Sequence, residues 1–209
     1  MRWFLDMNVI VYHIFETGHH LEKKARLFVK KKGDSKFLLC EYIRKDLPKW
    51  VERQEEILRW FNTKISGQKI EEDKMDLFNK DKIFLNRLIL NYESSKDKEK
   101  FKVNINRIFA FLKIKSKLFL EKYINEFVVP IKEIDFELFS SLNTSLQNIS
   151  DAKTIASGIQ EHQSNKLTLI TADKKDWNKE NLEWSIPSAS NLDKKYPSLP
   201  KIQYLQNFN

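Results

Sequence analysis

The chain has 209 residues, of which 41% are hydrophobic, 12% aromatic and 32% charged, and its formal net charge at pH 7 is +8. This length and apolar content predict a folded chain with one substantial core and exclude a disordered protein. The positive charge favours an anionic partner, which is a nucleic acid, an anionic membrane or an acidic protein segment.

Membrane-spanning and disulfide-stapled architectures do not fit the sequence. No window approaches about 20 consecutive apolar residues, the length of a membrane-spanning helix, and the start Met1–Asp6 meets an acid too early for a signal peptide. Cys40 is the only cysteine, which excludes an intrachain disulfide and a Cys-based zinc cluster and predicts a packed thiol. We therefore expect a cytoplasmic protein without a membrane segment.

The first third of the chain predicts strands that alternate with helices. Short apolar runs predict the strands, and apolar residues at helical spacing predict the helices. In chain order these elements are expected at 2–5 (strand), 20–32 (helix), 37–39 (strand) and 41–61 (helix). Pro48 marks a kink or a restart in the last of them. Trp50, Trp60 and Phe61 fall at helical spacing and predict core positions, with base stacking as the alternative.

The rest of the chain begins with a highly charged stretch and then returns to the alternating pattern. In chain order, the later elements are expected at 105–127 (long amphipathic helix), 128–131 (strand), 136–142 (helix), 151–163 (helix), 167–170 (strand) and 183–186 (strand). Short strands separated by helices, with few hairpin signals, predict an α/β fold with a central parallel sheet and right-handed crossovers. We expect one domain over 1–209, with a tail at about 190–209 that packs on the domain or serves as a docking strand.

Acidic residues follow two of the predicted strands. Asp6 comes directly after the first strand, and Asp173 comes three residues after Ile170. In an open parallel sheet such ends meet at one edge, so we expect these acids to face each other. Asp151, in a Ser150-Asp151 pair that opens the preceding helix, either caps that helix or points to the same edge. Clustered carboxylates repel one another unless a cation neutralises them, so such a cluster implies a bound metal. Ligands that are all oxygens suit Mg²⁺ or Mn²⁺.

Three sequence runs around these acids resemble the acidic motifs of the PIN-domain family. The runs are Phe4-Leu5-Asp6-Met7-Asn8-Val9, Ser150-Asp151-Ala152-Lys153-Thr154-Ile155-Ala156 and Leu169-Ile170-Thr171-Ala172-Asp173-Lys174-Lys175-Asp176-Trp177. They occur in the family's order and on the expected elements. The resemblance covers the first fifty residues and about 128–187, and it implies a three-layer sandwich in which 62–126 is a helical insertion.

The resemblance also implies a set of site residues. The acids that match the family's metal ligands are Asp6, Asp46 or Glu41, Asp151 and Asp173. Asp46 has the family's spacing after Cys40 but replaces its usual Glu, and Glu41 is the rival. Asn8 and Thr171 are expected to orient the site, and Asp176 adds a further carboxylate. The plain alternative for these acids is a role as helix caps or turn residues.

The resemblance implies a metal-dependent endoribonuclease that holds one or two Mg²⁺ or Mn²⁺ ions, cuts RNA, and acts in some family members as the toxin of a toxin–antitoxin pair. A cognate antitoxin and a homodimer are further partners that it implies. The alternatives are a non-catalytic RNA-binding or scaffold module and a DNA-directed structure-specific nuclease.

Lys113, Lys115 and Lys117 predict either an RNA-backbone surface or a solvated helix face. His19 and His20 predict an exposed turn, with metal ligation as the alternative.

Overall fold

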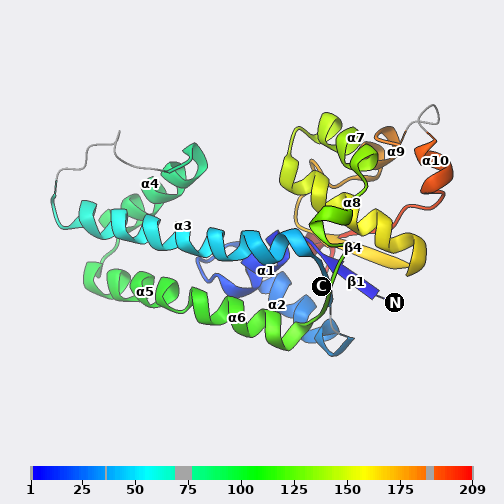
Figure 1. Cartoon of the computed structure of the whole chain (residues 1–209). Helices are drawn as coiled ribbons and strands as arrows, with labels where there is room; N and C mark the ends of the chain where they lie inside the picture. Colours follow the sequence, from blue (N-terminus) through cyan, green and yellow to red (C-terminus); the bar gives the residue numbers. More distant parts are fainter. Residues whose placement is uncertain (1, 36, 69–76, 187–190, 209) are drawn as a thin grey trace. The chain divides into compact units, whose positions relative to one another are not determined.

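The computed structural model describes residues 2–35, 37–68, 77–186 and 191–208. The chain divides into two compact units (Figure 1). The sheet unit comprises 1–47 and 116–209, and the helical unit comprises 48–115. The sequence predicts a helical insertion at 62–126, so the helical unit begins and ends earlier than expected. No helix in the described parts of the chain is long and apolar enough to cross a membrane.

The sheet unit is built on a five-stranded sheet in which all paired strands are parallel. Its strands are β1 (Arg2–Leu5), β2 (Phe37–Cys40), β3 (Ile124–Val128), β4 (Leu167–Thr171) and β5 (Lys201–Tyr204). The spatial order is β3-β2-β1-β4-β5, so the direction of winding reverses between β1 and β4. This confirms the predicted α/β class with a central parallel sheet.

Helices of the sheet unit cover both faces of the sheet. The long helices of the whole chain, of which α4 and α5 belong to the helical unit, are α1 (Met7–Ile14), α2 (His20–Lys32), α3 (Glu41–Ile65), α4 (Asn79–Glu93), α5 (Lys98–Ala110), α6 (Leu112–Tyr123), α7 (Phe136–Leu146) and α8 (Ile149–Ser164). Consecutive residues of β1 point to opposite faces: the Trp3 ring lies 6.0 Å from Phe28 of α2, whereas Phe4 packs against α8 beside Gly158. The sheet is therefore the middle of three layers.

Short elements complete the sheet unit. They are the 3-10 turns η1 (Gly33–Ser35), η3 (Ile131–Glu133) and η5 (Leu205–Asn207) and the helices α9 (Lys179–Trp184) and α10 (Leu192–Lys195). Cys40 is fully buried at the end of β2, as expected for a packed thiol.

The helical unit has its own core of aromatic and aliphatic side chains. The fully buried Phe61 ring lies 5.9 Å from Tyr92 of α4 and 6.3 Å from Phe101 of α5. Trp50 and Trp60, also expected in the core, are half-buried. Pro48 lies within α3 without ending it.

Three of the predicted elements are wrong, each because strand pairing or chain geometry overrides a local pattern. The predicted helix at 105–127 is two helices, broken at Phe111, followed by β3. Residues 124–128 pair with β2, and this pairing wins over helical periodicity. The predicted strand at 128–131 ends at Val128, because Val129 adopts a positive φ of 50° and Pro130 cannot donate to a ladder.

The third wrong prediction is the last predicted strand, at 183–186. The stretch at 183–186 begins inside α9, which Asn178 caps through its side chain. Trp184 is 75% exposed, so its apolar ring does not mark a core strand. The fifth strand, β5, lies in the segment expected to be a tail, which therefore packs on the domain as a strand of the sheet.

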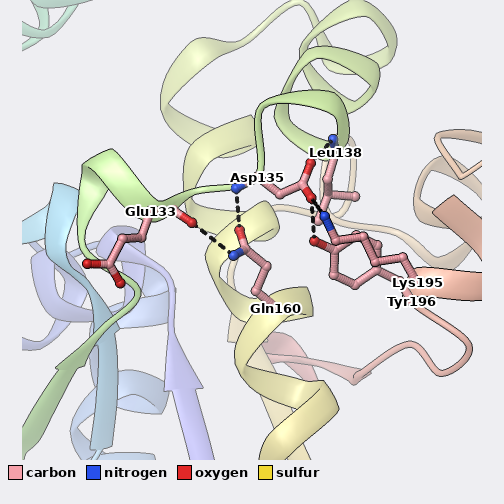
Figure 2. Close-up of polar contacts among 6 residues, drawn as sticks. All are labelled: Glu133, Asp135, Leu138, Gln160, Lys195 and Tyr196. Carbon is pink, nitrogen blue, oxygen red and sulfur yellow. Dashed lines mark hydrogen bonds and ion pairs between the residues drawn. The ribbon is translucent and has the colours of Figure 1, made fainter.

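Asp135 joins α7, α8 and α10 (Figure 2). Its carboxylate caps α7 by accepting the Leu138 N–H at 2.9 Å, and it also accepts the Tyr196 hydroxyl at 2.9 Å and forms an ion pair with Lys195. Gln160 of α8 accepts the Asp135 N–H at 2.8 Å and donates to a carbonyl of η3 at 3.1 Å. Burial raises the pKa of Asp135, but the donors Lys195, Leu138 and Tyr196 outweigh burial and hold the pKa below its ordinary value of 3.8. The network ties the start of α7 to α8 and to the end of α10.

Gly158 permits the close approach of α8 to the sheet. A Cβ at this position would lie 2.8 Å from Leu169 Cδ2 and 3.4 Å from Phe4 Cε1, and both of these side chains are fully buried. We expect Gly158→Val to lower the free energy of unfolding by about 1–3 kcal/mol through overpacking, measured by urea denaturation. Ser164→Val, at an exposed position of the same helix, is the control and should change it by less than about 0.5 kcal/mol. Equal effects of the two substitutions would contradict close packing at Gly158.

Candidate metal centre

The candidate site lies where the sheet changes its direction of winding. β1 and β4 are neighbours, and their carboxyl ends are followed by Asp6 and by the turn Thr171–Asp173. The crevice at such a switch point is where open parallel sheets bind ligands. The backbone N–H of Asp6 donates to the carbonyl of Ile170 at 2.9 Å, which places the first acid directly beside β4.

Asp6 is 3% exposed and is held by polar neighbours on both sides. Its carboxylate accepts the Thr171 hydroxyl at 2.7 Å and the Asn8 side-chain amide at 3.1 Å. It also serves as the N-cap of α1 through the Asn8 backbone N–H, 3.4 Å away. Asn8 and Thr171 therefore contact this acid directly, as their expected role of orienting the site requires.

Three further acids form a compact carboxylate group. One carboxylate oxygen each from Asp151, Asp173 and Asp176 lies within 4.8 Å of the others, and all three side chains are partly exposed. Asp173 is oriented by the backbone N–H groups of Lys175, at 2.7 Å, and of Asp176, at 3.1 Å. Asp176 is expected to add a carboxylate to the site, and the structure places it inside the group.

Asn148 frees Asp151 from the capping role that the sequence suggests. The N-cap of α8 is Asn148, whose side-chain oxygen accepts the N–H groups of Ser150 and Asp151 at 3.2 and 3.3 Å. The Ser150-Asp151 pair therefore does not open the helix as predicted. Asp151 instead lies in the first turn, where its carboxylate accepts the Asn148 amide at 2.5 Å. Sequence reasoning missed Asn148, although an Asn just before a helical repeat is a recognisable capping signal.

Burial and like charges destabilise the ionised state of this group. Burial raises the pKa of Asp6 to about 7, and the Asp151 charge adds to the increase, while hydrogen bonds from Thr171 and Asn8 oppose it. Burial likewise raises the pKa of Asp151 to about 6; the fully buried Trp177 ring N–H opposes this, and the charges of the other two acids of the group reinforce it. A bound cation would remove this cost by neutralising the carboxylates.

The two candidate acids of α3 have different neighbours. Glu41 accepts the backbone N–H of Ile131 at 2.9 Å and so holds the segment after β3. Asp46 accepts the Ser150 hydroxyl at 3.5 Å, one residue from Asp151. Among the described residues, Asp6, Asp46 and Glu41 all lie outside the group of three carboxylates. Of the two α3 acids, Asp46 contacts the helix that carries Asp151.

The donor set fits a hard divalent cation. The group of three carboxylates offers oxygen ligands alone, which Mg²⁺ and Mn²⁺ prefer. The charge of Asp151 also acts on the buried Asp6. His19 lies outside the group of three carboxylates, and its Nδ1 accepts the Leu21 N–H at 3.3 Å as the N-cap of α2.

Comparison of the chain with protein-family models, with curated proteins and with solved structures found no match.

The raised pKa of Asp6 predicts a pH-dependent stability in the absence of metal. The carboxyl favours folding fully below its ordinary pKa of 3.8, and this contribution is lost as pH rises through the folded-state value of about 7. We expect Asp6→Asn to remove this loss, so that the variant is at least as stable as the wild type at neutral pH. Urea unfolding in chelator across this pH range measures the difference.

The control for this experiment is Asp34→Asn, at an exposed position of η1. Its stability should follow that of the wild type at every pH. A parallel pH dependence in the wild type and Asp6→Asn would contradict the destabilising role of the buried carboxylate.

Proposed function

We propose that the sheet unit is a metal-dependent endoribonuclease of the PIN type that hydrolyses RNA phosphodiester bonds. The observation that carries the proposal is the group formed by Asp151, Asp173 and Asp176, next to the buried Asp6, at the switch point of a parallel sheet. Buried and like-charged carboxylates at a crevice are typical of metal-assisted active sites. The net charge of +8 supports an anionic substrate.

In this proposal the chain's residues divide into ligands and orienting groups. Asp151, Asp173 and Asp176 would hold the cation, and Asp6, which lies outside this group, would add a fourth negative charge near it. A bound Mg²⁺ or Mn²⁺ supplies Lewis acidity for the attack of water on the phosphodiester and neutralises charge that develops on the departing oxygen. Thr171 donates to Asp6 and, through its hydroxyl oxygen, accepts the Asp173 N–H at 2.9 Å, so one side chain positions two of the acids.

The fourth acid, the toxin role and the homodimer that the resemblance implies stay predictions. Asp46 is the closest match to the family's fourth acid and contacts Ser150 rather than the group of three carboxylates. This observation favours a second candidate function, a non-catalytic RNA-binding module of the same fold. The toxin role, with its cognate antitoxin, and a homodimer derive from the resemblance alone.

Cleavage of a mixed RNA pool tests the proposal. We expect cutting with Mn²⁺ or Mg²⁺, none with chelator, and a loss of about 100-fold or more in Asp151→Asn and Asp173→Asn, because each removes a charged ligand. Asp34→Asn should cut as the wild type does. Retained cutting in both site variants would overturn the site assignment.

Metal binding separates the nuclease from the binding module. We expect Mn²⁺ to raise the free energy of unfolding, by about 2.7 kcal/mol when its concentration is about 100 times Kd. Asp151→Asn should abolish most of this stabilisation, as measured by thermal or urea unfolding. Stabilisation by Mn²⁺ without cleavage of any RNA would favour a metal-binding module that is not a nuclease, and no stabilisation would favour the metal-free RNA-binding module.

The segment formed by α5 and α6 predicts salt-dependent RNA binding. Residues 98–123 contain eight Lys or Arg and two Glu, a net +6 of the chain's +8. We expect Lys113→Gln with Lys117→Gln to reduce the slope of log affinity against log salt by about 0.7 for each phosphate of single-stranded RNA that these lysines neutralise. The same change at Lys179 and Lys194, both exposed, alters net charge equally and should leave the slope closer to the wild type. Equal slopes for the two double variants would mean that α6 does not contact RNA.

A further inference from the structure

Three tyrosines lie at the same edge of the sheet as the acids. Tyr12 is on α1, which begins directly after Asp6; Tyr42 follows β2 by two residues; and Tyr204 ends β5, where it pairs in register with Thr171. Each side chain is half-buried, so each ring keeps an exposed part. The three tyrosines lie far apart along the chain, so no local sequence pattern connects them.

Each tyrosine ring has a basic or imidazole side chain against it. His19 stacks on Tyr12 with centroids 4.8 Å apart and planes 20° apart. Lys153 Nζ lies 4.8 Å from the Tyr42 centroid, and Lys174 Nζ lies 5.6 Å from the Tyr204 centroid.

The two lysines are also neighbours of the acids in sequence. Lys153 follows Asp151 by two residues, and Lys174 follows Asp173 directly. Positive charge is therefore placed beside the acidic centre, next to aromatic rings. A cation beside a flat ring is the arrangement that single-stranded nucleic acid needs, since its phosphates contact the charge while its bases stack on the rings.

The acids also act on these phenols. Burial raises the pKa of Tyr12, and the charges of Asp6 and Asp173 add to it. Burial and the Asp173 charge raise the pKa of Tyr204 in the same direction. Both phenols therefore lie close enough to the acids to sense their charge.

We propose that Tyr12, Tyr42 and Tyr204, with His19, Lys153 and Lys174, form a stacking rim that selects unpaired nucleotides at the acidic centre. The rim follows the carboxyl edge from β2 to β5, a span of three strand spacings or about 14 Å. Bases held in a duplex have no free faces to stack, so duplex RNA is attracted by the lysines but not by the rings. The proposal deepens the nuclease function and rests on it for the chemistry, but the rim binds RNA whether or not cleavage follows.

Binding of fluorescently labelled RNA of about 12 nucleotides, a length within the footprints of single-strand binders, tests the rim. Anisotropy is measured on the full chain in Ca²⁺ buffer, with single-stranded RNA and with the same sequence as a duplex. We expect Tyr12→Ala and Tyr204→Ala each to weaken single-strand binding about tenfold, the size of one base stack, with little effect on the duplex. Tyr12→Phe and Tyr204→Phe keep the ring and should stay within about twofold of the wild type.

The charge control is Lys194, an exposed lysine of α10 in the same unit. Lys174→Ala should weaken single-strand binding more than Lys194→Ala does, although both remove one positive charge. Urea unfolding of every variant separates weaker binding from weaker folding, and the Phe variants keep the test decisive if an Ala variant unfolds.

The outcomes separate this inference from the proposed function. Ring-dependent binding of single strands, with no cleavage under Mn²⁺, would uphold the rim and overturn the nuclease. Metal-dependent cleavage with single-strand binding unchanged in the Ala variants would overturn the rim and uphold the nuclease. Equal binding of duplex and single strand by the wild type would also overturn the rim.

Discussion

Repulsion among carboxylates is the constraint on which the rest of the sheet unit depends. Asp6 is almost fully buried, and Asp151, Asp173 and Asp176 approach within 4.8 Å of one another. Without a cation, burial and like charges raise the pKa values of Asp6 and Asp151 to about 7 and about 6. A fold selected for stability alone has no reason to gather these charges, so the arrangement supports the proposed metal site.

The surrounding structure opposes this repulsion with short-range contacts. Thr171 and Asn8 donate to Asp6, and Asn148 takes the cap of α8 so that the Asp151 carboxylate is directed elsewhere. The close approach of α8 to the sheet at Gly158 and the Asp135 network at the start of α7 hold that helix in place. The acids are thus positioned by packing that lies well outside the site, which is how rigid scaffolds keep reactive groups in register.

The candidate active site and most of the net positive charge lie in different units of the chain. The acids and the proposed tyrosine rim belong to the sheet unit, whereas residues 98–115 of the helical unit carry six Lys or Arg and one Glu, a net +5 of the chain's +8. Basic helices contact RNA through its backbone, whereas rings contact its bases, and these two kinds of contact differ in salt dependence and in response to base pairing. In the proposed function, the affinity for RNA and the selectivity for unpaired bases can therefore be measured separately.

The sequence by itself determined the α/β class, the boundaries of α2 at 20–32, and the placement of Asp6 and Asp173 after strands, because a short apolar run that ends in an acid is a local pattern. Tertiary structure decided β3 and β5, since the partner strand supplies the hydrogen bonds that override helical periodicity at 124–128 and give the tail an edge to pair with. It also decided that Asp176 joins the group of acids, that Asn148 rather than Asp151 caps α8, and that three tyrosines share one edge. These residues lie far apart in sequence, and only the parallel sheet, which gathers the carboxyl ends of its strands, brings them together.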